Sequence, residues 1–104
     1  MAQFDIYHNP DPETRHKIPY LLDVQTNMLG QLATRVVIPL VVASKIGKIA
    51  KKLNPKIEIE KVTLAMSTAE ITAVSSHILT EKVSSLAERR EEIIAALELL
   101  FTGI

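Results

Sequence analysis

Cysteine and tryptophan are both missing from the 104 residues, and aromatic side chains make up only 4% of them. Without cysteine the chain has no disulfide, no thiolate nucleophile and no cysteine-based zinc site. Acidic and basic residues number 12 each, so the formal net charge is +0 and gives no general attraction to nucleic acid or membranes. An electrostatic partner would therefore have to recognise a local patch.

Long apolar segments are missing as well. No apolar run approaches the roughly 20 residues of a membrane span, and residues 1–5 carry neither the basic nor the apolar part of a signal peptide. We therefore expect a soluble, cytoplasmic protein without membrane contacts. The length predicts one domain over residues 1–104, small enough for dimerisation to add usefully to its buried area.

Catalytic and phosphate-binding motifs are absent, since the sequence has no G-x-S-x-G, P-loop or G-x-G-x-x-G. The histidines His8, His16 and His77 lack the spacing of helical metal ligands. Glu58 and Glu60 would share one strand face, which a solvated surface explains. We therefore expect no catalytic residue, metal or cofactor. Sites assembled from distant residues leave no motif, so an enzyme stays open as an alternative.

Apolar and polar residues alternate along much of the chain, which predicts β-strands. The segment Arg35–Val42 is β-branched and almost continuously apolar, as expected of a strand buried on both faces, and Pro39 predicts a bulge or an edge position within it. Lys61 predicts a tight turn or a bulge between two strands. The other predicted strands are Gln3–His8, Ile18–Gln25, Lys56–Glu60, Val62–Met66 and Ile71–Leu79.

Two segments between the strands stand out by composition. Residues 26–34 include Gly30 and predict a loop that carries the apolar pair Met28 and Leu29. Residues 43–55 space lysines and apolar residues as in a short amphipathic helix, interrupted by Gly47. No carboxylate interrupts the lysines, so they form either a solvated surface or a docking site for an acidic chain. They are Lys45, Lys48, Lys51, Lys52 and Lys56.

The C-terminal segment predicts a long amphipathic helix, begun by a cap at Thr80 or Ser84. One broad apolar face comprises Val83, Leu86, Ile93, Ile94, Leu97, Leu100 and Phe101. A thinner stripe on the opposite side holds Ala95, Leu99 and Thr102. Several antiparallel strands followed by one helix give an α+β fold.

Five stretches, in the same order along nearly the whole chain, resemble the CcdB toxins of the Ccd toxin–antitoxin system. The V-I-P-L strand and the Gly-Ile terminus are the most specific of them. The five are Gln3-Phe4, Asp23-Val24-Gln25 with the apolar pair that follows, Arg35–Leu40, Arg90–Leu97 and Gly103-Ile104.

The resemblance implies an antiparallel sheet with SH3-like barrel character and a long C-terminal helix, in a homodimer. It implies a protein that is not an enzyme but a poison of DNA gyrase, which binds the A subunit and traps the cleaved DNA. Double-strand breaks then arrest growth. It also implies neutralisation by a CcdA-like antitoxin with a disordered acidic C-terminal segment, a role in plasmid maintenance, and co-repression at promoter DNA that is bound only through the antitoxin.

Residue by residue, the resemblance implies a gyrase contact on one loop and on the C-terminal helix with its tail. Its members are Met28, Leu29, Glu98, Leu99, Phe101, Thr102, Gly103 and Ile104. The five lysines would receive the acidic antitoxin segment. The best-known members end in Trp-Gly-Ile and commonly have asparagine at the position of Glu98, whereas this chain ends Thr102-Gly103-Ile104.

Two alternatives stay open. RNA-cleaving toxins of the MazF and Kid type share the implied fold, and fold alone does not fix function. For such a nuclease, the candidates are His8, Arg15 and His16. Because Thr102 replaces a large indole of the kind that dominates interface energies, the chain is alternatively a non-toxic relative that only binds antitoxin.

Overall fold

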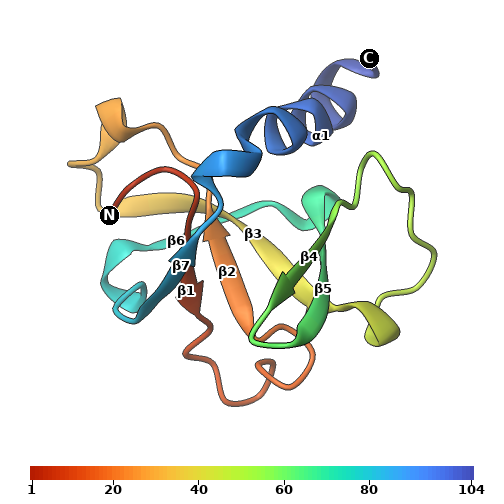
Figure 1. Ribbon diagram of the computed structural model, residues 1–104. Helices are drawn as coiled ribbons and strands as arrows, with labels where there is room; N and C mark the ends of the chain where they lie inside the picture. The colour runs from red at the N-terminus through yellow and green to blue at the C-terminus, as the bar shows by residue number, and fades with distance from the viewer.

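The computed structural model describes residues 1–104 and has an α+β architecture, with a curled antiparallel sheet and one C-terminal helix (Figure 1). Six strands follow one another across the sheet in the order β4-β5-β3-β2-β1-β7, and β6 pairs separately with β3. The predicted fold class is confirmed. The strands are β1 (Asp5–His8), β2 (Tyr20–Asp23), β3 (Thr34–Val42), β4 (Lys56–Ile59), β5 (Val62–Met66), β6 (Thr72–Ser75) and β7 (Lys82–Ser85), and the helix is α1 (Arg90–Thr102).

Strand β3 is the centre of the sheet. One of its edges pairs with β2, and the other pairs with β6 over Thr34–Val37 and with β5 over Leu40–Val42. Pro39 lies in the gap between the two, where its carbonyl accepts a hydrogen bond from Ser67 N (2.9 Å). The N and O atoms of one strand residue face the same edge of the strand. The missing N–H of Pro39 therefore faces this gap, where no neighbouring strand would accept a hydrogen bond from it. Pro39 thus lies at a gap in the pairing of a central strand, so the predicted bulge or edge position was wrong.

The sheet is apolar on both faces at its centre. On one face Ile6, Leu22 and Ile38 belong to a core cluster that α1 covers with Ile93 and Ala96. On the other face Tyr7, Leu21, Val37 and Leu79 form a smaller cluster. Since successive side chains point to opposite faces, burial of both explains why the central strands read as continuous apolar runs.

The turn between β4 and β5 is as tight as predicted at Lys61. Glu60 and Lys61 both have positive φ, at 50° and 68°, and Ile59 pairs directly with Val62. Two consecutive residues with positive φ make the hairpin turn whose twist matches the flanking strands.

Residues 43–55 do not form the predicted helix. Only Ala43–Lys45 make a single 3-10 turn, and the rest is turn and loop. Asn54 shapes the loop instead, accepting from Ala50 N at 3.0 Å and donating to Met66 O at 2.8 Å. A short segment that contains Gly47 gains too few helical hydrogen bonds to compete with such contacts.

The C-terminal helix begins later than predicted. Val83 lies in β7, which pairs with β1, and Leu86 N donates to Phe4 O at 2.8 Å. A 3-10 turn at Ala87–Arg89 then leads into α1. Val83 and Leu86 still pack against the core cluster. The apolar spacing therefore predicted correctly that Val83 and Leu86 contact the core, and predicted wrongly that their backbone is helical.

Candidate functional site

The C-terminal end of α1 projects away from the sheet and presents apolar side chains to solvent (Figure 1). Gly103 adopts a left-handed conformation (φ 76°), and its N donates to Leu99 O at 3.0 Å, which caps the helix. Thr102 Oγ1 donates to Glu98 O at 2.6 Å. The capped helix directs Ile104 outward, where it is 77% exposed, and Phe101 is 69% exposed.

Phe101 is the exception on the predicted apolar face of α1. Ile93 and Ala96 are buried and Leu97 is half-buried, but the core ends before Phe101. Glu98 is exposed, whereas Leu99 is half-buried. The solvent-exposed apolar groups of the helix are therefore confined to its last turn and the tail.

The loop between β2 and β3 carries a second group of exposed apolar side chains. Met28 is 91% exposed, and Leu29 and Leu32 are each 49% exposed. Thr26 Oγ1 accepts from Met28 N at 3.3 Å and caps the single 3-10 turn Asn27–Leu29. The resemblance implied Met28 and Leu29 but not Leu32, which is as exposed as Leu29. A third apolar residue close to this pair was the available signal in the sequence.

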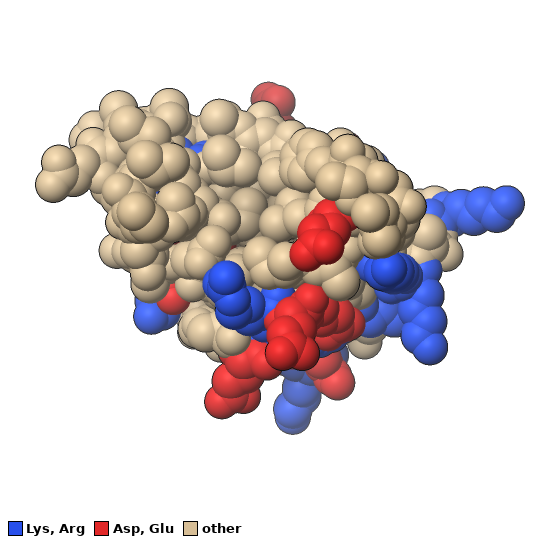
Figure 2. Space-filling view, turned by 90° about the horizontal axis from the view of Figure 1, so that it is seen from above, with Lys and Arg blue, Asp and Glu red and all other residues tan.

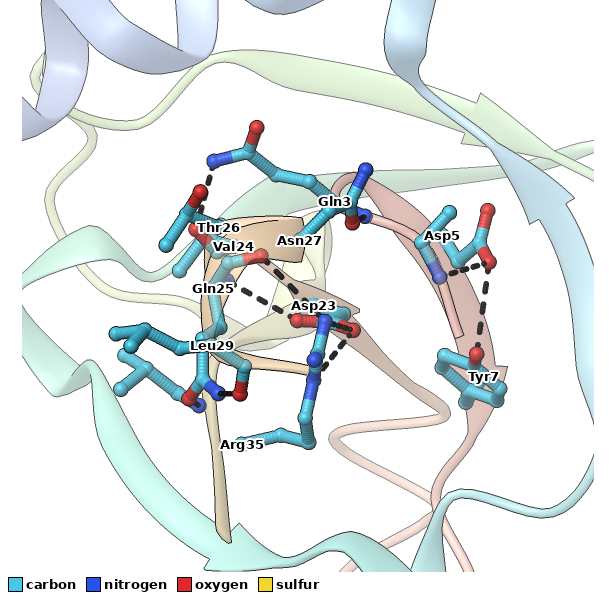
Figure 3. A network of polar contacts seen from close by, with 12 residues as sticks. Gln3, Asp5, Tyr7, Asp23, Val24, Gln25, Thr26, Asn27, Leu29 and Arg35 are labelled. Carbon is cyan, nitrogen blue, oxygen red and sulfur yellow. Dashed lines mark hydrogen bonds and ion pairs between the residues drawn. The ribbon is translucent and has the colours of Figure 1, made fainter. Parts of the chain in front are cut away.

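A buried polar network holds this loop in place (Figure 3). Arg35 Nε and Nη2 donate to Asp23 Oδ2 at 3.0 and 2.6 Å, and both residues are fully buried. Asp23 Oδ1 accepts from Gln25 N at 3.0 Å. Gln25 Nε2 then donates to Leu29 O at 2.8 Å. This network was not predicted from the sequence, although an arginine and an aspartate within buried strands signal a paired charge.

The two apolar groups lie near opposite ends of α1 within one chain. Gln3 connects the loop to the start of the helix, because its N donates to Asn27 Oδ1 at 2.7 Å and its Oε1 accepts from Arg90 Nη1 at 3.2 Å. Ile104 follows the other end of the helix, which is 13 residues or about 20 Å long. The structure therefore does not bring Met28 and Leu29 together with the tail in a single protomer.

All five lysines of the predicted docking site are exposed, and none forms an ion pair within the chain. Lys52 Nζ donates to Ile104 O at 3.3 Å, which brings this segment against the tail. A hollow of about 450 Å³ is lined by Lys51, Lys56, Ile49 and Glu92, among others. A neighbouring hollow of about 370 Å³ lies between Lys52 and α1. Lysines and apolar groups thus share a grooved surface along the helix.

The residues considered for nuclease chemistry are only partly assembled. His8 and Arg15 line one pocket, and His16 is not part of it. No group of three histidine, cysteine, aspartate or glutamate side chains is arranged to hold a metal. Burial raises the pKa of Tyr7 and of Tyr20 above the usual 10.0, with the negative charges of Asp5 and Glu60, respectively, adding to the effect. Both hydroxyls therefore remain protonated at neutral pH.

The curled sheet and the helix that ends in exposed apolar side chains define a small α+β protein with surfaces suited to binding other macromolecules. None of its helices has the length and apolar character that a membrane crossing requires. A family model described as CcdB protein matches residues 3–103. The chain therefore belongs to the CcdB family, a bacterial family of toxins of toxin–antitoxin systems.

Proposed function

We propose that this chain poisons DNA gyrase by binding the A subunit and trapping the complex in which the DNA is cleaved. The observation that carries the proposal is the C-terminal tail, where Phe101 and Ile104 are exposed at the end of a capped helix. Exposed apolar groups on a rigid element bind a partner at little entropic cost. The contact comprises the residues implied by the resemblance, Met28, Leu29, Glu98, Leu99, Phe101, Thr102, Gly103 and Ile104.

The gyrase contact is built from two copies of the chain. In one protomer the Met28 loop and the tail lie at opposite ends of α1, so a two-fold dimer can place the loop of one copy near the tail of the other. Charged side chains crowd the lower and right-hand part of Figure 2, and its upper left part is almost free of them. Such an uncharged surface favours contact between copies.

The lysine segment is the docking surface for an acidic antitoxin. A disordered acidic chain gains charge pairing from lysines that form no ion pair within the chain, and apolar contacts with Ile49 and Ile94 in the hollows beside them. The carboxylates of Glu91, Glu92 and Glu98 also line these hollows. Lys52 also contacts the terminal oxygen of the tail, so one bound peptide would cover part of both surfaces. Promoter DNA is reached only through the antitoxin, because the chain carries no net positive charge of its own.

A plasmid cleavage assay tests the proposed activity. The protein is mixed with gyrase, supercoiled plasmid and ATP, and the reaction is denatured before electrophoresis. We expect linear plasmid to accumulate with increasing toxin, and a structured messenger RNA incubated in parallel to remain whole. Cleaved RNA would assign the chain to the RNA-cleaving class instead. Intact RNA without linear plasmid would identify a relative that only binds antitoxin.

Charge reversal in the lysine segment should weaken antitoxin binding. With Lys48→Glu and Lys51→Glu together, two favourable charge contacts become repulsive, so we expect affinity for the acidic antitoxin segment to fall by about 10- to 100-fold at low salt. Isothermal titration calorimetry measures the loss, which should shrink as added salt screens the charges. The control is Lys61→Glu on the β4–β5 turn, outside the segment. Equal losses in both variants would contradict this docking surface.

A further inference from the structure

A separate polar pocket of about 340 Å³ lies at the end of the sheet away from α1. Its lining includes His8 at the end of β1, Arg15 in the loop that follows, and Glu81 just before β7. The start of β1 adjoins the entry to α1, because Phe4 O accepts from Leu86 N, so the far end of β1 is remote from the helix. In Figure 1 the loop between β1 and β2 forms the bottom of the molecule. The proposed gyrase contact and the five lysines are not part of this pocket.

The loop that carries Arg15 is organised without any ligand. Asn9 is buried, and its Nδ2 donates to Ile18 O at 2.8 Å and to Thr14 Oγ1 at 3.0 Å. Its Oδ1 accepts from Asp11 N at 3.1 Å, and Arg15 N donates to Asp11 O at 3.0 Å. Three hydrogen bonds of the buried Asn9 amide and the bond from Arg15 N to Asp11 O fix the path of the loop. The backbone of Arg15 is therefore already held at the pocket before a ligand binds.

The two charged side chains of the pocket, Arg15 and Glu81, have no ion-pair partner within the chain. The backbones of the two segments that meet at the pocket are held together, because His8 N at the end of β1 donates to Glu81 O just before β7 at 3.0 Å. The exposed ring of His8 lies 5.4 Å from the buried ring of Tyr20 at an interplanar angle of 35°, and Pro10 and Pro19 also line the pocket. A cation, an anion and the His8 ring thus border one small cavity.

We propose that this pocket binds a ribonucleoside monophosphate group, either as a free nucleotide or at the end of an RNA chain. The Arg15 guanidinium matches a phosphate with two parallel donors. A carboxylate such as Glu81 accepts hydrogen bonds from the paired hydroxyls of a ribose, as acidic residues do in dinucleotide sites. The exposed His8 ring, which rests against Tyr20, offers a stacking surface for a base. The cavity is within the size range of small-ligand sites.

Binding is measured by titrating the ¹⁵N-labelled full-length protein with a ribonucleoside monophosphate, its 2′-deoxy analogue, inorganic phosphate and a short single-stranded RNA. We expect saturable amide shifts at His8, Arg15, Tyr20 and Glu81 with the ribonucleotide, and at least several-fold weaker binding of phosphate alone. Tighter binding of the RNA than of the nucleotide would assign the site to an RNA end, and equal or weaker binding to a free nucleotide.

Two variants and a control decide whether the pocket itself is responsible. Arg15→Gln should weaken ribonucleotide binding by about tenfold or more. Glu81→Gln should remove the preference for the ribose over the deoxyribose form. Arg89→Gln deletes one positive charge at the entry to α1, outside the pocket and the proposed contacts, and should leave binding unchanged. The proposal is wrong if no pocket amide shifts, if phosphate alone binds equally well, or if Arg89→Gln matches Arg15→Gln. None of these results bears on gyrase, since the pocket is remote from the tail.

Discussion

A variant that ends at Thr102 will fold normally and will fail to trap gyrase-cleaved DNA. Gly103 and Ile104 are exposed, and their removal deletes only the Gly103 cap, so the free energy of unfolding should fall by no more than about 1 kcal/mol. Burial of an isoleucine side chain in a partner contributes about 1.5–3 kcal/mol. A dimer presents the tail twice, so we expect the concentration needed for half-maximal plasmid cleavage to rise by about 10²- to 10⁴-fold.

Three measurements separate a lost contact from a lost fold. The free energy of unfolding measured in urea should stay close to that of the full-length chain. Sedimentation should still give the mass of a dimer, and the gyrase assay should no longer yield linear plasmid. Ile104→Ala keeps the Gly103 cap and should reproduce most of the loss. Val62→Ala removes an exposed apolar residue from the β4–β5 hairpin and should retain full activity. Unfolding of the truncated chain, or undiminished poisoning by it, would refute the role proposed for the tail.

The fold was predictable from local patterns wherever burial has a regular period. Alternation along Lys56–Glu60 identified β4, because one face of that strand is buried and the other is solvated. Alternation along Val62–Met66 also identified β5, although Leu64, Ala65 and Met66 are all buried and Val62 is exposed. The continuous apolar run Arg35–Val42 identified the central strand for the complementary reason, since clusters lie on both faces. Both the alternating and the continuous apolar patterns follow directly from which side chains are buried on folding.

Patterns failed where a side-chain hydrogen bond or a remote strand decides the backbone. Nothing local in residues 43–55 reveals that Asn54 will contact Ala50 and Met66. Val83 and Leu86 have helical spacing, but pairing of residues 82–85 with β1 makes that segment a strand. Phe4 has a positive φ of 71°, which is unfavourable for a bulky residue and is compensated by hydrogen bonds to Asp23 and Leu86. Such contacts join residues far apart in sequence.

The candidate site, too, was only partly predictable from the sequence. Sequence placed Phe101 on the core-facing side of the helix, and only the end of the packed core at Ala96 and Leu97 shows why it is exposed. The family resemblance supplied the function proposed for the tail, which no spacing rule provides. Asp23 and Arg35 were used only as resemblance residues, although their burial as a pair carries the largest stability effect that we expect in this chain.

Removing the charge of Arg35 should destabilise the fold more than any exposed substitution. Arg35→Leu would leave the Asp23 carboxylate fully buried with only Gln25 N as a partner. Breaking a buried pair in this way costs about 3–5 kcal/mol, a large part of the roughly 5–15 kcal/mol that stabilises a typical domain. The Gln25 contact to Leu29 O depends on the same network, so the Met28 loop should loosen as well.

A double-mutant cycle in urea isolates this pair from the general cost of altering the core. Arg35→Leu and Asp23→Leu should each be strongly destabilising, whereas the double variant should lose much less than the sum, because no unpaired charge remains. Arg35→Lys, which keeps the charge and loses the planar fork, provides a measurable intermediate if Arg35→Leu does not fold. The exposed pair Arg89–Glu92 is the control, and Arg89→Leu should cost at most about 1 kcal/mol. Additive losses in the cycle would show that Asp23 and Arg35 act independently.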